Sequence, residues 1–166
     1  MNIKKSVALT LMGVTMAIAG ASYFFPAAQE GAAGKRGLET LIIASVHSSR
    51  MHEFEVEIAS TPQEKEMGLM FRETMPPDHG MLFQLGEERV IRFWMKDTLI
   101  PLDMIFIAAD GTVRKVYERA TPKSLEGISS DVPVKAVLEI NGGRANELGI
   151  VVGDKVVHPY FGLSKP

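Results

Sequence analysis

The clearest pattern along the chain lies between His52 and Ile58, where apolar and polar residues alternate strictly. Phe54, Val56 and Ile58 fall on one face and three glutamates on the other, so the pattern predicts a strand with one face on a core. Similar apolar runs bounded by turn residues predict further strands at residues 81–85, 90–95, 102–107, 112–117, 134–140 and 151–157.

Two short helices interrupt this series of predicted strands. The segment 60–64 reads Ser-Thr-Pro-Gln-Glu, which supplies a cap at Thr61, a proline at the first helical position and a glutamate for a capping box. Residues 144–148 allow one helical turn that ends at Gly149. Short strands with so little helix predict a mainly β fold of α+β type: a single compact, barrel-like, curled antiparallel sheet with two short helices.

The first residues form a pattern of another kind. Lys4 and Lys5 precede an apolar run at 7–21, and Ala19-Gly20-Ala21 offers the small residues that a signal peptidase requires. We therefore expect residues 1–28 to be a signal peptide or, if uncleaved, an N-terminal membrane anchor. Either outcome makes the protein exported, and periplasmic or membrane-anchored facing the periplasm.

The remaining chain divides into a tether and one domain. Residues 29–37 are mostly Gly, Ala and charge, which predicts a flexible tether, and 38–166 is long enough for a single β-rich domain. This domain carries 14 Lys and Arg against 19 Asp and Glu, a net charge of about −5 with His neutral. Nucleic acid is therefore not an expected partner, and membrane contact is expected only through an uncleaved N-terminal segment.

Candidate metal and thiol chemistry finds little support. The chain has no cysteine, which excludes disulfides and thiolate metal sites. His47, His52, His79 and His158 are scattered without zinc-binding spacing. The methionines could hold Cu(I), but most lie in apolar runs where they more simply fill the core. We therefore expect neither a metal nor a cofactor.

The run FWMKDTLIPLD, residues 93–103, is the first candidate for a site. If the flanking strands pair as a hairpin with Met95 opposite Met104, then Lys96 faces Asp103 across the strands. A semi-buried carboxylate is costly alone, so Lys96 is its expected partner. Two interpretations stay open: a structural pair beside a tryptophan at the core rim, or a pocket with an apolar floor and convergent polar groups.

On the pocket interpretation, a set of aromatic, charged and thioether side chains is assigned to ligand binding. The candidates are Trp94, Lys96, Asp97, Asp103, Arg72 and Met95. Carboxylate chemistry is conceivable through Asp97, Asp103 or Glu139, with a nearby cation as electrophile, but no residue set identifies a reaction. Glu139 lies among Val137, Leu138 and Ile140, so we expect it to pair with Arg72 or Arg144.

Several phrases of the sequence match a known pattern. They are Thr61-Pro-Gln-Glu64, Gly68-Leu-Met70, Gly80-Met-Leu-Phe83, Phe93-Trp-Met-Lys96, Ile100-Pro-Leu-Asp103, Val137-Leu-Glu139, Gly149-Ile150 and Gly153-Asp154. Over about residues 52–158 they resemble the bacterial and archaeal domain-of-unknown-function family 192, with Asp97 where the family usually has asparagine. The resemblance implies a compact β-rich, barrel-like fold, often behind an export signal or lipoprotein leader, and implies no established activity, cofactor or catalytic residue.

The segment 149–156 is also similar to the GD box of cradle-loop barrels. A glycine there permits a change of backbone sign, and Asp154 can cap the exposed amides of a neighbouring turn. We therefore expect Asp154 to serve folding rather than a site.

Three functions remain open from the sequence. The favoured one is a binding module for a small ligand or a peptide segment in the cell envelope. The alternatives are a small hydrolase or lyase that uses carboxylates in the same cleft, and a structural partner of an envelope protein complex.

Overall fold

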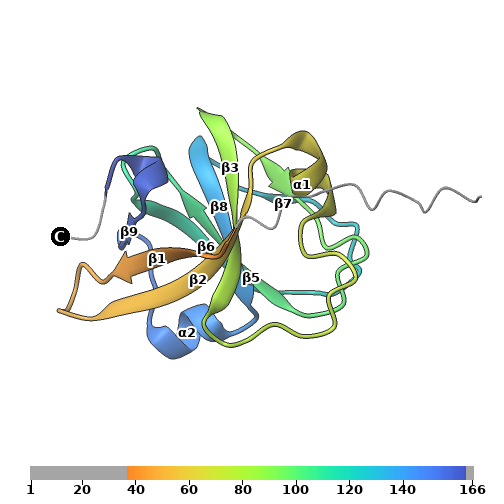
Figure 1. Cartoon of the computed structure of the whole chain (residues 1–166), viewed down its shortest axis with the longest axis horizontal. Helices are drawn as coiled ribbons and strands as arrows, with labels where there is room; N and C mark the ends of the chain where they lie inside the picture. Colours follow the sequence, from red (N-terminus) through yellow and green to blue (C-terminus); the bar gives the residue numbers. More distant parts are fainter. Residues whose placement is uncertain (1–36, 164–166) are drawn as a thin grey trace, which may run out of the picture. The chain divides into compact units, whose positions relative to one another are not determined.

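Figure 1 shows the computed structural model of the chain, in which residues 37–163 are described. The strands are β1 (Glu39–Ala44), β2 (Met51–Ala59), β3 (His79–Arg89), β4 (Arg92–Phe93), β5 (Leu102–Ile107), β6 (Val113–Ala120), β7 (Ile128–Ser129), β8 (Val134–Asn141) and β9 (Lys155–Val157). The helical segments are α1 (Pro62–Met67), α2 (Arg144–Leu148) and the 3-10 turn η1 (Pro159–Phe161). The predicted signal peptide and almost all of the predicted tether lie outside the described residues. No helix among residues 37–163 has the length and apolar character needed to cross a membrane.

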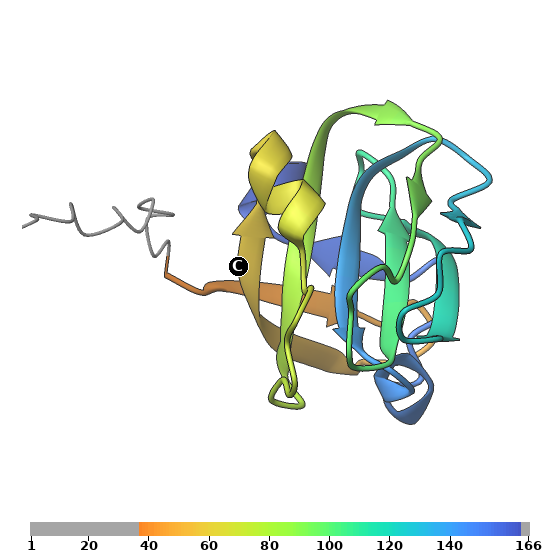
Figure 2. The ribbon, with the colours of Figure 1, turned by 90° about the vertical axis from the view of Figure 1, so that its right-hand side faces the viewer.

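Seven strands form one strongly curled sheet in the order β6-β5-β8-β3-β2-β1-β9, and β4 and β7 form a small second sheet (Figure 2). The two outer strands approach each other, because Thr112 bridges to Lys155 and the Val113 N–H donates to the Asp154 carbonyl at 2.9 Å. The result is a half-barrel with short helices, which confirms the predicted mainly β, barrel-like fold.

One strand pair departs from the predicted antiparallel pattern. β2 and β3 pair in parallel, with Val56 opposite Gly80, so the main sheet is mixed. Parallel neighbours need a crossover connection, and α1 lies within that crossover. The helix begins as predicted: the Thr61 side chain accepts from the Glu64 N–H, and the Glu64 carboxylate accepts from the Thr61 N–H at 2.8 Å.

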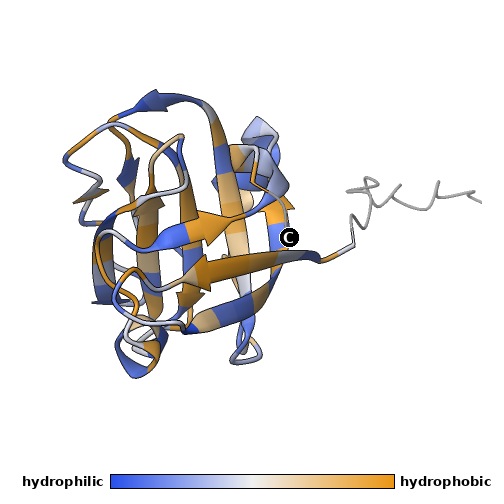
Figure 3. Cartoon of the chain, turned by 90° about the vertical axis from the view of Figure 1, so that its left-hand side faces the viewer, coloured by the Kyte–Doolittle hydropathy of each residue, from blue (hydrophilic) through white to orange (hydrophobic). Residues whose placement is uncertain are grey.

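The sheet buries apolar side chains on both of its faces. Figure 3 shows long hydrophobic stretches along its strands. All six residues of β5 are buried, and its side chains alternate between two clusters. Ile105 and Ile107 belong to the first cluster, while Met104 and Phe106 belong to the second. On neighbouring β8, Leu138 joins the first cluster. Side-chain alternation therefore directs Glu139 toward the second cluster, the one that borders the pocket described below.

The predicted hairpin around residues 93–103 does not form. β5 pairs with β6 on one edge and with β8 on the other, so Met104 lies opposite Tyr117 and Glu139 rather than Met95. The segment before it contributes only β4, which pairs with β7 instead. The prediction of this register was wrong because both edges of β5 are occupied by longer strands: β6, which follows it directly in the chain, and β8, which lies far from it in sequence.

Candidate functional site

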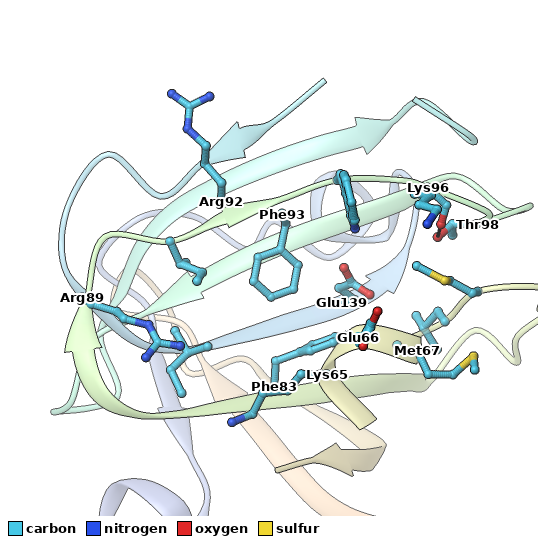
Figure 4. Close-up of a pocket in the computed structure, with 16 residues that line it drawn as sticks. Lys65, Glu66, Met67, Phe83, Arg89, Arg92, Phe93, Lys96, Thr98 and Glu139 are labelled. Carbon is cyan, nitrogen blue, oxygen red and sulfur yellow. Dashed lines mark hydrogen bonds between the residues drawn. The ribbon is translucent and has the colours of Figure 1, made fainter. Parts of the chain in front are cut away.

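A pocket of about 200 Å³ lies where α1, β3, β4 and β8 meet (Figure 4). Its walls combine charged and polar side chains with apolar ones, and the apolar ones include Leu69, Phe83, Leu85, Ile91 and Phe93. The chain leaves α1 through Gly68, whose φ of +47° favours glycine and where an added Cβ would lie 3.1 Å from the Phe83 ring. This tight passage holds the segment after α1 against the pocket wall.

Aromatic rings form one side of the pocket. Phe83 and Phe93 meet edge to face with their ring centroids 5.0 Å apart, and Phe93 meets Phe106 in the same way at 6.4 Å. Such contacts hold the rings in fixed orientations. Trp94 follows on the same segment, is 51% exposed and lines the pocket, with Lys96 Nζ 5.5 Å from the centre of its ring. The pocket therefore has a rigid aromatic wall and a solvent-exposed indole among its lining residues.

Glu139 supplies the buried ionisable group of the pocket, whereas the other buried polar residue of the lining, Thr98, is neutral and donates its hydroxyl to the Lys96 carbonyl at 3.3 Å. Its strand β8 lies between β3 and β5, which places the residue opposite Met81 on one side and Met104 on the other. The side chain lines the pocket yet the residue is only 4% exposed, and no other described residue forms a hydrogen bond or an ion pair with its carboxyl group. Burial without a partner raises the pKa of Glu139 to about 8, so most of this carboxyl group is protonated at pH 7.

The remaining charged groups lie around this central carboxyl group. In Figure 4 the side chains of Glu66 from α1 and Glu139 reach into the same space, while Arg92 and Arg89 lie at one end and Lys96 lies at the other. Glu66, Arg89, Arg92 and Lys96 are exposed. Because exposed charges are well solvated and screened, Glu139 is the desolvated group that a bound molecule would meet.

The comparisons with known proteins agree with this fold. The model of the DUF192 family, described as Uncharacterized ACR, COG1430, matches residues 43–158. The chain belongs to the DUF192 family. No curated protein matches the chain.

Two crystal structures are similar to this DUF192 protein. One is from Sinorhizobium meliloti 1021, described as a protein proposed to be a transcription regulator; it is 43% identical with a TM-score of 0.72, and the match covers 76% of this chain and 99% of that one. The other is a protein of unknown function from Novosphingobium aromaticivorans DSM 12444. It is 37% identical with a TM-score of 0.70, over 73% of this chain and 85% of that one.

Two of the six candidate ligand-binding residues lie in the lining of the DUF192 pocket, namely Trp94 and Lys96. Met95 is fully buried in the second core cluster. Asp97 has a φ of +52° in a tight turn, and its carbonyl accepts from the Phe71 N–H at 2.8 Å. Neither of these two residues lines the pocket.

Arg72 also lies outside the pocket lining, because it forms a two-point ion pair with Glu57 of β2. Its Nη2 lies 3.0 Å from Glu57 Oε2. Arg144, the other cation expected to neutralise Glu139, pairs with Asp78 and Glu147 instead. The predicted pairing of Glu139 was therefore wrong: Arg72 and Arg144 each form ion pairs with other carboxylates.

Asp103 is fully buried rather than placed at a pocket mouth, and the predicted pair with Lys96 does not form. Its Oδ1 accepts from the Arg119 and Gly143 N–H groups, both at 2.7 Å, and its Oδ2 accepts from the Ala145 N–H at 2.8 Å. Backbone donors thus take the place of the expected ammonium group. Asp103 joins β6 and the start of α2 to β5, which is a folding role.

Asp154 has the folding role that the sequence predicted. It accepts from the Val46 N–H at 3.0 Å and from the Val151 N–H at 2.9 Å, so it holds the turn after β1 against the turn before β9. Residues 37–163 contain no group of three or more metal-ligating carboxylates and histidines. Met75, Met81, Met95 and Met104 are buried in the second cluster, as expected of methionines that fill a core.

Sequence reasoning assigned Glu139 to possible carboxylate chemistry but left it out of the ligand-binding set, and it missed Glu66, Phe83 and Phe93. The missed signal was a glutamate whose neighbours on both sides are apolar in a strand with two covered faces. The residues of β8 from Ala136 to Ile140 are all buried, and a buried glutamate without a partner is costly, so its position in this run points to a special environment.

Proposed function

We propose that this DUF192 protein is an exported binding module that takes up a small ligand in the pocket over Glu139. The observation that carries the proposal is the carboxyl group of Glu139, which is buried, has no partner among residues 37–163 and lines the pocket. An unpaired buried carboxyl group costs stability, and folding alone gives no compensation for it. A ligand that hydrogen-bonds to it would recover that cost.

The size and lining of the pocket favour a small molecule over a peptide segment. Its volume is about 200 Å³, and its walls combine apolar and aromatic side chains with charged ones, while two polar residues of the lining, Thr98 and Glu139, are buried. Ligand sites typically combine an apolar surface with a few placed polar groups. Export is supported by the basic start, the apolar run and the small residues of the first 21 positions.

A carboxylate enzyme is the second candidate, because the raised pKa of Glu139 is what a general acid or base near neutral pH requires. A hydrolase or lyase also needs a second group that acts on the same bond. Glu66 lines the same pocket but is exposed, and none of the lining residues is Ser, Cys or His. Binding therefore accounts for the arrangement with fewer requirements.

The proposal can be tested with the only tryptophan of the chain, since Trp94 lines the pocket. A set of small amines, alcohols, amides and carboxylic acids is titrated into the purified protein while the emission of Trp94 is recorded. We expect at least one class to give a saturable change, which Glu139→Gln weakens and Arg72→Ala leaves unchanged. If no class changes the emission, or if amide shifts in NMR spectra map a bound compound away from the pocket, the proposal is wrong.

A further inference from the structure

We propose that the ligand of this pocket is a small organic amine with an apolar body, whose ammonium group pairs with Glu139 beside Phe83 and Phe93. This inference rests on the proposed binding function and adds the chemical class of the ligand. The apolar walls would hold the body of the molecule, and the carboxyl group would hold its charged end.

The first argument concerns what Glu139 lacks. Its strand neighbours Met81 and Met104 offer no hydrogen-bond donor from their side chains, and no described cation reaches it. A buried carboxylate is stable when an opposite charge and several donors compensate its desolvation. An ammonium group brings one positive charge and, in a primary amine, three N–H donors, so it meets both needs at once.

The second argument concerns the aromatic lining. Phe83 and Phe93 line the pocket that Glu139 borders, and Trp94 lines it as well. The negative faces of such rings attract ammonium groups, with tryptophan the strongest of the three types. Lys96 already uses this interaction, since its Nζ lies 5.5 Å from the centre of the Trp94 ring. A carboxylate with aromatic neighbours is a favourable environment for a cation and an unfavourable one for an anion.

The third argument concerns where the protein's own charges lie. The charged groups from the elements around Glu139 are Lys65 and Glu66 of α1, Arg89 of β3, Arg92 of β4 and Lys96 of the following loop. The guanidinium of Arg92 packs over Gly127, where an added Cβ would lie 3.1 Å from its Nη1. Arg89, Arg92 and Lys96 are exposed and Lys65 is half-buried; Glu66 is exposed as well, but its side chain reaches into the same space as Glu139 in Figure 4. Asp103 lies on β5 next to Glu139's strand, but its carboxylate is saturated by backbone donors.

The protonation of Glu139 gives this inference a distinctive signature. In the free protein the carboxyl group holds a proton at pH 7, because burial raises its pKa to about 8. Pairing with an ammonium group requires the carboxylate, so binding releases roughly nine-tenths of a proton per ligand at pH 7. A neutral ligand that accepts a hydrogen bond from the protonated acid would release none.

The experiment is isothermal titration calorimetry with hexan-1-amine, hexan-1-ol and hexanoate at pH 7, each in two buffers of different ionisation enthalpy. We expect the amine to bind at least about ten-fold more tightly than the other two probes and to release about one proton. Glu139→Gln should weaken amine binding by at least about ten-fold and abolish the proton release. Arg72→Ala is the matched control, because Arg72 pairs with Glu57 outside the pocket lining, and it should bind the amine as the wild type does.

Thermal melting of Glu139→Gln shows whether this variant folds. Glu139→Asp gives a second test: because this variant keeps a carboxyl group, it should still release a proton when the amine binds. Equal or tighter binding of hexanol or hexanoate, with Trp94 emission still responding, overturns the amine class and leaves the binding proposal standing. Amine binding by Glu139→Gln with wild-type affinity also overturns the class. No response of Trp94 to any of the three probes overturns the amine class, and the broader compound set under the proposed function then decides whether the pocket binds at all.

Discussion

Asp103 Oδ2 accepts a hydrogen bond from the Ala145 N–H at 2.8 Å, and this contact ties the start of α2 to β5. The same carboxylate accepts two further backbone N–H groups through Oδ1. In asparagine at this position, an N–H₂ group would replace one of the two carboxylate oxygens. That group cannot accept a hydrogen bond, so at least one backbone N–H would lose its partner. We expect Asp103→Asn to lower the free energy of unfolding by about 2–4 kcal/mol, measured by urea denaturation.

Lys96→Ala is the matched control for Asp103→Asn, because a hairpin pair between the two residues would make both variants unstable. Lys96 is exposed, and its described contact is the one with the Trp94 ring. We expect this variant to lose less than about 1 kcal/mol. Similar losses in the two variants would contradict the assignment of Asp103 to backbone capping.

Glu139→Gln should change how stability depends on pH. The pKa of Glu139 is about 8 in the folded protein and near the ordinary value when unfolded, so between these values the folded state binds the extra proton. The wild type therefore loses stability as pH rises toward 8, by up to about 1.4 kcal/mol per pH unit from this group. The variant lacks this loss. We therefore expect urea denaturation at pH 5, 6.5 and 8 to show the unfolding free energy of the variant rising relative to that of the wild type as pH rises. A difference in unfolding free energy that stays the same at all three pH values would contradict the prediction.

Trp94→Ala should separate binding from folding. The indole is 51% exposed, so its removal should cost less than about 1 kcal/mol of unfolding free energy while it weakens any ligand held in the pocket. Phe93→Ala serves as comparison, because that ring packs between Phe83 and Phe106 and its loss should cost about 3 kcal/mol. A large fall in the melting temperature of Trp94→Ala would assign the indole to the core instead.

His158 should make the protein sensitive to acid. The residue is 2% exposed, its Nδ1 accepts from the Tyr160 N–H at 3.2 Å, and burial lowers its pKa despite the nearby Glu39 carboxylate. The unfolded chain therefore binds a proton more readily than the folded one below pH 6.5, so stability falls as pH drops from there. His158→Asn can keep the bond to Tyr160 and removes this titration. Its unfolding free energy should fall less than that of the wild type between pH 6.5 and 5, and equal losses would contradict the assignment.

Local patterns in the sequence were sufficient for β2, α1 and the turn around Asp154. Each is defined within a few residues: alternation in β2, a capping box at Thr61, and a glycine with a capping aspartate before β9. β1 was missed, although Leu41 and Ile43 are fully buried, because its short apolar run has no alternation or turn signal of its own. Short apolar runs of this kind are ambiguous from periodicity alone.

The pairing of β5 with β8 and the pocket could not be derived in the same way, because both depend on contacts between distant segments. Met104 lies beside Glu139 across 35 positions of sequence, and the pocket joins α1, β3, β4 and β8. The hairpin prediction paired β5 with the segment that precedes it in the chain, whereas β5 pairs with the strand that follows it, β6, and takes the distant β8 as its other partner. Trp94 and Lys96 line the pocket because the loop after β4 borders it. Asp103 does not, because its side chain points to the other face of β5, where it contacts the start of α2.

The most direct test of the central claim is an NMR titration of the Glu139 side-chain carboxyl carbon in the protein without added ligand, assigned by comparison with Glu139→Gln. A buried carboxyl group without a partner should titrate with a midpoint near 8. Addition of hexan-1-amine at pH 7 should then shift this carbon to the position of the ionised form. A midpoint below about 5, the ordinary range for glutamate, would mean that Glu139 is solvated or paired in the protein and would remove the basis of the proposed site.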